Sequence, residues 1–387
     1  MLSLPEVESQ EIGARESSEF WGKWNSLVRR YGSNGFYFGG FVECYMNASR
    51  DVGWTPQLIV GKSDGRLVGV AALQTRGVVG GRTASSLFPR NYGTDFVVDP
   101  QYRGRFVRNT LKFLFEKLRC QYLDLIMPSE SPNLECLRQS SNSLGFQLAN
   151  APLRREFTEH SVIEVAGTWD EFKSKKGPKF IRRYREIEKL LSKSGNWTTQ
   201  RTPLDGPEPV GMIETIERNS WKDAWRRERG VQHDPNLPAL FANWTLKSSS
   251  GGVLPELFLL KLNGVPIAYT IVLQLNGVAL LCKTSFDRRY AKASPGEYIQ
   301  NVALQHLFES RAVSRIDFLT ALAYVNRWTS LRYTRERVTV SRTVPILSDV
   351  VRTLKRSGLV REAYNAVWHP EMVHRETHHS LKREELG

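Results

Sequence analysis

A short loop in the last third of the chain, residues 288–297, combines positive charge with the signature of a helix start. Its charged, capping and small residues are Arg288, Arg289, Lys292, Ser294, Gly296 and Glu297. Ser294 precedes a proline and stands three residues before a glutamate, which predicts an N-cap and a helix from residue 295. The first N–H groups of a helix are unpaired, and the helix dipole favours negative charge there. The loop is therefore a candidate anion-binding site.

Three other side chains near this loop can hold or move a proton. Asp317 ends a predicted short strand, where a carboxylate can act as a general base or orient an amine. An ion-paired or helix-capping carboxylate would produce the same pattern, so both interpretations stay open. Tyr290 and Tyr324 carry hydroxyls that can give a proton to a leaving group, although tyrosines in such segments more often belong to the core.

The histidines and cysteines predict no metal site. His306 lies in the predicted helix, where we expect a core histidine, and His233 is the other histidine that we place inside the fold of the second half. The histidines of the C-terminal tail have metal-like spacing but no carboxylate or cysteine framework around them. The cysteines are far apart and match neither zinc spacing nor a disulfide framework. These residues are His374, His378 and His379, and Cys44, Cys120, Cys136 and Cys282.

A strand meander that leads into a helix must position the candidate residues. The Asn-Gly pairs at 263 and 276 each separate two β-rich runs, and Asn-Gly is a strong hairpin signal because both residues accept positive φ. The two turns predict three antiparallel strands between residues 256 and 286. A helix follows, with apolar residues at three- and four-residue spacing over 298–308, and then a short strand at 315–318.

A similar order of elements occurs earlier in the chain, and we interpret it as an internal duplication. Helices, a hairpin, a strand, a helix and a strand precede residue 150, at residues 19–31, 38–49, 58–73, 96–98, 103–118 and 122–126. The second round begins with a strand, a basic helix, a strand and two helices, at residues 161–165, 169–194, 198–201, 209–225 and 237–249. One or two strands near 338–344 and a helix at 350–367 come after the meander.

The duplication predicts two domains. We expect an N-terminal extension at residues 1–15, a first domain at 16–158, a second domain at 159–368 and a polar tail at 369–387. A length of 387 residues with 41% hydrophobic residues suits two globular cores. The sequence contains no apolar run of about eighteen residues and no signal-peptide core near its N-terminus. We therefore expect a cytoplasmic protein.

The net charge of +14 predicts an anionic partner. A nucleotide cofactor, RNA, an acidic substrate and a membrane surface all fit this charge. The sequence contains no P-loop, Ser-His-Asp signature or nucleic-acid module that would select one of these partners.

Four motifs, taken in order, resemble the GNAT acyltransferase superfamily. They are the basic segment 175–190, Ser220-Trp221-Lys222 before Gly230, Tyr290 with Ser294-Pro295-Gly296, and Asp317-Phe318-Leu319 with Trp328. Their order is most similar to the tandem branch of BioF-like and CelD-like acetyltransferases, which is related to the FemAB aminoacyl-transferases. The resemblance spans residues 15–345.

The resemblance implies an α+β fold of two tandem GNAT-like domains, each with a central mixed, mostly antiparallel sheet flanked by helices. It implies an N-acyltransferase that uses acetyl-CoA or another acyl-CoA as co-substrate, without a metal. The acceptor would be an amine of a small molecule, sugar or peptide bound between the domains, and the CoA pyrophosphate would bind at residues 289–296. The residues implied for catalysis are Asp317, Tyr290 and Tyr324, and those for the acceptor are Trp221, Lys222 and Trp328.

The chain departs from the family pattern at three places. The loop at 289–296 keeps only the last of its usual small positions, and residues 320–328 lack the usual acidic residue and lysine. In the first domain Phe106 and Arg108 stand where glycines would let a phosphate approach, so we expect one CoA per chain. Two alternatives stay open: a FemAB-like transferase that uses aminoacyl-tRNA, which the positive charge suits, and a non-catalytic binding protein on a degenerate GNAT scaffold.

Overall fold

A computed structural model describes residues 6–10, 17–32, 34–51, 53–78, 81–88, 92, 95–151, 158–220, 253 and 255–342. All of them belong to one compact unit. The helices predicted at 237–249 and 350–367, the polar tail, His233, Trp221 and Lys222 lie outside these ranges. The predicted division into domains stays a prediction.

One sheet of fourteen strands runs through the described residues. In chain order the strands are β1 (Glu6–Gln10), β2 (Thr55–Ser63), β3 (Arg66–Val78), β4 (Gly81–Ser86), β5 (Val97–Val98), β6 (Cys120–Pro128), β7 (Gln147–Ala151), β8 (Glu159–Glu164), β9 (Trp197–Pro203), β10 (Glu256–Leu262), β11 (Val265–Leu275), β12 (Val278–Phe286), β13 (Arg315–Asp317) and β14 (Arg332–Ser341). Their order in the sheet is β1-β2-β3-β4-β6-β14-β8-β13-β12-β11-β10-β9, with β5 beside β3 and β7 beside β14. Among these pairs, β4–β6 and β12–β13 are parallel and the others antiparallel, which confirms the predicted mixed, mostly antiparallel α+β fold.

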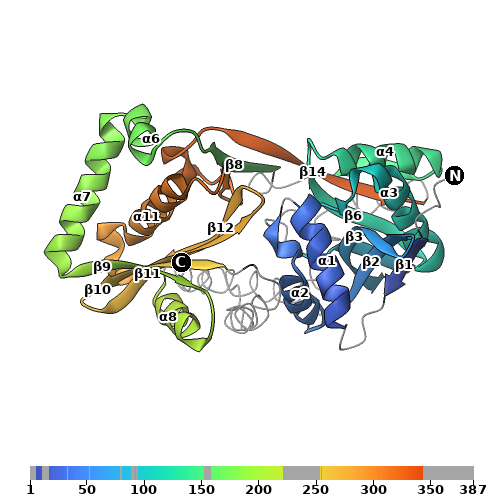
Figure 1. Cartoon of the computed structure of the whole chain (residues 1–387), viewed down its shortest axis with the longest axis horizontal. Coiled ribbons are helices and arrows are strands. Elements are labelled where there is room, and N and C mark those ends of the chain that lie inside the picture. The colour runs from blue at the N-terminus through green and yellow to red at the C-terminus, as the bar shows by residue number, and fades with distance from the viewer. Residues whose placement is uncertain are drawn as a thin grey trace, which may run out of the picture. The chain divides into compact units, whose positions relative to one another are not determined.

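The helices flank this sheet (Figure 1). In chain order they are α1 (Ser18–Tyr31), η1 (Gly35–Tyr37), α2 (Gly39–Asp51), η2 (Pro100–Tyr102), α3 (Arg103–Lys112), η3 (Phe113–Lys117), α4 (Pro132–Ser143), α6 (Trp169–Lys176), α7 (Pro178–Ser194), α8 (Pro207–Arg218), η4 (Arg288–Ala293), α11 (Pro295–Ser310) and η5 (Ala323–Arg327). Within the described ranges, none of these helices is long and apolar enough to cross a membrane.

Strand alternation places apolar residues on both faces of the sheet in the first half. Leu58 and Val60 of β2 pack in one cluster with α1 and α2, whereas Ile59 packs in another with α3 and α4. Figure 1 shows these two helix pairs on opposite faces. The period of two in a strand therefore accounts for a sheet that is covered on both sides.

The meander that the Asn-Gly pairs predict is present in the second half. β10 pairs with β11 and β11 with β12, both antiparallel. Asn263 and Asn276 adopt φ of 50° and 48°, and the glycines that follow also have positive φ. Helices α6, α7 and α11 pack in an apolar cluster with one face of these strands, and α8 packs with the other. This prediction is confirmed.

β14 links the two halves of the sheet. Residues 332–334 pair with β8, and residues 335–341 pair with β6 of the first half. Residues 337–341 also pair with β7. β14 follows the β10–β12 meander in the chain, yet most of it lies beside strands of the first half. Its first residues consequently lie next to β8, where the candidate site is found.

Three sequence predictions of secondary structure were wrong in their bounds. The basic helix predicted at 169–194 is two helices, because Gly177 adopts φ of 85° and Pro178 has no N–H with which to continue α6. The helix predicted at 103–118 is α-helical only to Lys112 and ends in a π-helical turn, η3. The last strand begins at Arg332 rather than near residue 338.

Candidate active site

Two parallel strands of the second half separate at the candidate site. β12 and β13 pair only between residues 278–280 and 315–317. β13 ends at Asp317, whereas β12 continues to Phe286 and remains paired with β11 on its other side. In the described part of the chain no strand pairs with residues 281–286 on the β13 side. An extended ligand can add to such a strand edge through main-chain hydrogen bonds.

Asp317 lies where these strands separate and is 6% exposed. Its Oδ1 accepts a hydrogen bond from the N–H of Leu319, and its Oδ2 accepts one from the hydroxyl of Tyr333, both at 2.7 Å. Nδ1 of His160 lies 3.3 Å from Oδ1. Burial acts to raise the pKa of this carboxyl, but His160, Tyr333 and the Leu319 N–H together hold the pKa below its ordinary value. Asp317 is thus a buried carboxylate.

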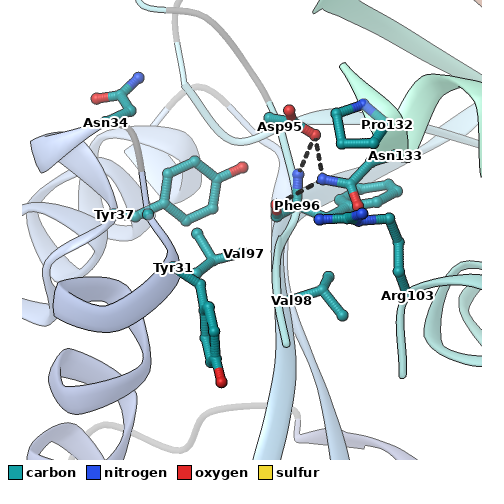
Figure 2. Close-up of a pocket in the computed structure, with 11 residues that line it drawn as sticks. Tyr31, Asn34, Tyr37, Asp95, Phe96, Val97, Val98, Arg103, Pro132 and Asn133 are labelled. Atoms are coloured by element: carbon teal, nitrogen blue, oxygen red, sulfur yellow. Dashed lines mark hydrogen bonds between the residues drawn. The ribbon is translucent and has the colours of Figure 1, made fainter. Parts of the chain in front are cut away.

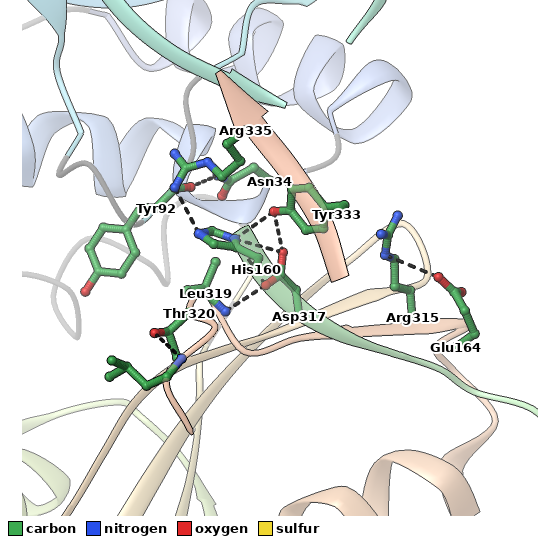
Figure 3. Close-up of polar contacts among 11 residues, drawn as sticks. Asn34, Tyr92, His160, Glu164, Arg315, Asp317, Leu319, Thr320, Tyr333 and Arg335 are labelled. Atoms are coloured by element: carbon green, nitrogen blue, oxygen red, sulfur yellow. Dashed lines mark hydrogen bonds and ion pairs between the residues drawn. The ribbon is translucent and has the colours of Figure 1, made fainter. Parts of the chain in front are cut away.

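His160 connects Asp317 with a buried arginine (Figure 3). The imidazole is completely buried, with Nε2 2.9 Å from Nη1 of Arg335 and Nδ1 2.7 Å from the hydroxyl of Tyr333. A guanidinium only donates hydrogen bonds, so Nε2 must accept and the proton of a neutral imidazole must be on Nδ1. The hydrogen bonds then run in one direction, from Arg335 to His160, to Tyr333 and to Asp317.

The environment sets the charges along this chain of hydrogen bonds. Burial raises the pKa of the Tyr333 hydroxyl, and the Asp317 carboxylate raises it further. Burial lowers the pKa of Arg335, an effect that Tyr333 and Asp317 oppose. An arginine stays protonated in proteins, so the chain has a cation at one end, an anion at the other, and two neutral groups between them. Such a chain can hold or move a proton.

The predicted anion-binding loop forms η4 and the start of α11. The Arg288 and Lys292 side chains are exposed. Arg289 is exposed too, but its Nε and Nη2 lie 3.0 and 2.6 Å from Oδ2 of Asp287. The Asp287 carboxylate therefore neutralises one of the three cations. Among the described residues no carboxylate pairs with Arg288 or Lys292, so their charge is available to an anion.

The start of α11 differs from the predicted capping box. Ser294 and Pro295 occupy the expected N-cap and first positions, but Ser294 is left-handed with φ of 49° and its side chain makes no cap hydrogen bond. Its hydroxyl instead accepts a hydrogen bond from Nη2 of Arg183 at 2.6 Å. Glu297 pairs with Arg183 at 3.3 Å and also with Arg327. The capping prediction was wrong in this detail because two arginines from α7 and η5 reach the same helix end.

Gly296 is in close contact with β12. The residue is buried, and a Cβ there would lie 2.8 Å from Cδ1 of Phe286. Glycine thus gives α11 room against the end of β12. A substitution at this position consequently changes packing before it changes the access of a ligand to the backbone.

We expect Gly296→Ala to lower the free energy of unfolding by about 1–2 kcal/mol, because the Phe286 ring must move. Gly211→Ala in α8 is the matched control, since a Cβ at Gly211 would meet nothing within 4 Å. The control should be neutral or stabilise by up to about 1 kcal/mol through helix propensity. Urea unfolding followed by circular dichroism measures both effects, and equal effects would contradict the packing role of Phe286.

Tyr290, Tyr324 and Trp328 pack or hydrogen-bond with residues other than Asp317. Tyr290 lies in η4 and packs against the apolar cluster of the second half. Tyr324 lies in η5 and is 41% exposed. Trp328 is buried and donates its indole N–H to Oδ1 of Asn301 at 2.7 Å. The roles proposed for these three residues stay predictions.

Three members of the cluster, His160, Tyr333 and Arg335, were not predicted from the sequence. We expected His306 to be a core histidine, whereas His306 is only partly buried and His160 is completely buried. One signal could have identified His160. It stands at the start of the strand-like run 160–163, and a polar residue in a buried strand is unusual.

In the corresponding segment of the first half, Phe106 packs into the core. We predicted that the Phe106 side chain blocks a phosphate there, but it points into the core and Arg108 is exposed. A Cβ at Gly61 or Gly69 would lie 2.6 Å from the Phe106 ring. Phe106 is therefore not the side chain that blocks a phosphate, because these two glycines accommodate it beneath the β2–β3 hairpin. The block by the exposed Arg108 stays a prediction.

A small cavity of about 150 Å³ lies beside β5 in the first half (Figure 2). Among its lining residues, Asp95 accepts hydrogen bonds from Oγ of Ser131 at 2.6 Å and Nδ2 of Asn133 at 2.7 Å. Burial raises the pKa of Asp95, and these hydrogen bonds oppose the shift. Ligand pockets usually measure about 300–1,000 Å³, so this cavity is too small for a nucleotide cofactor.

Comparison with known proteins agrees with this architecture. The sequence profile of the acetyltransferase (GNAT) domain matches residues 178–335, which include both separated strands and Asp317. No curated protein sequence matches the chain. The match to this domain and the fold confirm the predicted resemblance to the GNAT superfamily and the predicted fold class.

Solved structures with the same fold cover most of the chain at low sequence identity. FemX has 13% identity and a TM-score of 0.60, over 89% of this chain and 99% of FemX. L-PGS from Bacillus licheniformis has 11% identity and a TM-score of 0.54, over 91% of this chain and 98% of that one. The C-terminal domain of a putative lysylphosphatidylglycerol synthetase from Agrobacterium fabrum has 11% identity and a TM-score of 0.51, over 87% and 95%. These likenesses describe the fold.

Proposed function

We propose that the protein is an N-acyltransferase that moves an acyl group from acyl-CoA to an amine. The observation that carries this proposal is the separation of β12 from β13, with the buried carboxylate of Asp317 at the point of separation. The extended arm of CoA would add to β12 at residues 281–286, on the side where no described strand pairs with it, much as a strand would. Its thioester would then lie beside Asp317.

The loop at 288–297 would bind the phosphates of CoA. Arg288 and Lys292 offer exposed positive charge close to the start of α11, and a helix start favours an anion. Arg183 and Arg327 add further charge there, although Glu297 neutralises part of it. The acceptor, an amine of a small molecule, sugar or peptide, would bind in a cleft between the two domains.

The reaction needs a neutral amine, a polarised thioester carbonyl and a proton for the departing thiolate. Asp317 would take the amine proton, directly or through Tyr333, whose hydroxyl lies 2.7 Å from it. The amine nitrogen would bond to the carbonyl carbon as the carbon–sulfur bond breaks. Tyr290 or Tyr324 would give the thiolate its proton.

Release of free thiol from a set of acyl-CoAs, with and without a panel of amines, tests the function directly. Amine-dependent release and an N-acylated product are expected. CoA binding without turnover on any donor–acceptor pair would instead favour a binding protein on a degenerate scaffold.

We expect one CoA to bind per chain, because the cavity beside β5 in the described part of the first half, about 150 Å³, is too small for a nucleotide cofactor. Calorimetry of the full chain with CoA measures stoichiometry and affinity. Arg288→Gln with Lys292→Gln should weaken binding about tenfold or more, since both cations face solvent at the proposed phosphate site. The charge-matched control is Lys189→Gln with Lys193→Gln, which removes two exposed lysines from the C-terminal part of α7. Two CoA per chain, or equal affinities of the two double variants, would contradict the assignment.

A second candidate function is transfer from an aminoacyl-tRNA. The end of α6 and the length of α7 carry exposed cations, which are Lys175, Lys179, Arg182, Arg185, Lys189 and Lys193. The net charge of +14 suits a polyanion, and the folds of FemX and of a lysylphosphatidylglycerol synthetase are similar. Transfer RNA binding that falls steeply with salt, together with no binding of CoA, would favour this donor.

A further inference from the structure

Arg335 is a buried cation at a change of strand partner. Residues 332–334 pair with β8 and residues 337–341 with β7, so Arg335 lies between the two pairings. Only 2% of the residue is exposed. Removing a guanidinium from water is unfavourable unless its N–H groups find acceptors. The acceptors around Arg335 therefore decide what this residue does.

Two nitrogens of Arg335 lack acceptors among the described residues. Nη1 lies 2.9 Å from Nε2 of His160. Nε and Nη2 are buried, and neither has a hydrogen-bond partner among the described residues. A buried charged donor without a partner is strongly unfavourable. A ligand with a suitable pair of oxygens would satisfy both groups at once.

Two other arginines of the chain show what this edge of a guanidinium binds. Nε and Nη2 of Arg337 lie 2.8 and 2.6 Å from the two carboxylate oxygens of Asp124. Arg289 uses the same two nitrogens on the carboxylate of Asp287. This side-on arrangement matches a planar carboxylate in both distance and direction. Arg335 presents the same edge, buried and with no carboxylate from the described part of the chain.

We propose that the Nε/Nη2 edge of Arg335 binds a carboxylate of the acceptor, which is thus an amine of the amino-acid class. Only one part of this inference, that the acceptor carries an amine, rests on the proposed acyltransferase function. One imidazole separates Arg335 from Asp317, with contacts of 2.9 Å to Nε2 and 3.3 Å from Nδ1. An amino acid can therefore direct its carboxylate to Arg335 and its amine toward Asp317. The two charges of the site complement the two charges of such a molecule.

Binding of each common amino acid and of its amide to the full chain tests the proposal. The amide has the same shape but no anion, and thermal shift followed by calorimetry measures both. We expect at least one amino acid to bind, and its amide to bind about 100-fold more weakly. Arg335→Gln should weaken the amino acid by a similar factor, and Arg335→Lys should recover only part, because an ammonium lacks the two-pronged edge.

Arg337→Gln is the matched control, because it lies on the same strand and Asp124 already occupies its Nε/Nη2 edge. Its affinity for the amino acid should equal that of the wild type. Inorganic phosphate, added in the same assay, distinguishes a carboxylate site from a site for other oxyanions.

Four results would overturn the proposal: no binding of any amino acid, equal binding of acid and amide, binding of phosphate without carboxylates, or unchanged affinity in Arg335→Gln. The comparison of acid with amide uses wild-type protein, so it decides the question even if Arg335 variants fail to fold. The assays need neither CoA nor turnover. If no carboxylate binds, the acyltransferase proposal is unaffected. If no acyl transfer is found, a measured carboxylate site is unaffected.

Discussion

Asp317→Asn is expected to lower turnover by about 100- to 10,000-fold while the affinity for CoA stays near that of the wild type. The asparagine keeps the size of the side chain and can still accept the hydrogen bond of the Leu319 N–H, which lies 2.7 Å from Oδ1. It cannot take a proton from an amine. Thiol release with an identified acceptor measures turnover, and calorimetry measures the affinity for CoA.

Asp124→Asn is the control for this prediction. Asp124 is a partly buried carboxylate in the sheet that Arg337 holds, but it lies in the first half, and turnover should be unaffected. Tyr290→Phe and Tyr324→Phe, measured beside it, should differ, since one leaving thiolate needs one proton donor. If these two variants and Asp317→Asn all retain nearly full turnover, catalysis is positioning alone and the proposed roles are wrong.

The charge of Asp317 can be checked independently through acid stability. Because its pKa in the folded protein is below the ordinary value of 3.8, the carboxylate stabilises the fold above that pH. The contribution is lost as the pH falls below 3.8 toward the lower folded-state pKa. Wild type should therefore lose more stability than Asp317→Asn over this range, as urea unfolding at successive pH values would show.

Local signals account for the elements that the sequence analysis predicted well. The Asn-Gly pairs at 263 and 276 require positive φ within two residues, and this requirement fixes the meander whatever the rest of the chain does. Pro295 likewise begins α11 where expected. The capping role of Ser294 failed because Arg183, more than a hundred positions away, competes for its hydroxyl.

The hydrogen-bonded cluster could not be predicted in the same way. His160 lies in β8 and Arg335 in β14. These two strands pair although they are far apart in the chain. Nothing in their immediate neighbours fixes that pairing. Asp317 was identified because its strand follows directly from the meander, and its partners were missed because they depend on where β14 lies.

Of the substitutions proposed for this protein, His160→Ala should lower the free energy of unfolding most, by about 3–5 kcal/mol. The ring is completely buried, so its removal leaves a cavity. It also leaves Arg335 without the acceptor of its Nη1 and Asp317 without its nearest imidazole. Urea unfolding, with circular dichroism as the readout, measures the loss.

His306→Ala on α11 is the matched control, because that ring is only partly buried and its ring centroid lies 5.6 Å from that of Phe258. We expect it to cost about 1 kcal/mol or less. Adding Arg335→Met to His160→Ala should recover part of the loss, because the second change removes a buried cation that has lost its acceptor. A double variant as unstable as the sum of the single ones would mean that His160 stabilises the fold by packing alone, and that the chain of hydrogen bonds to Asp317 contributes nothing to it.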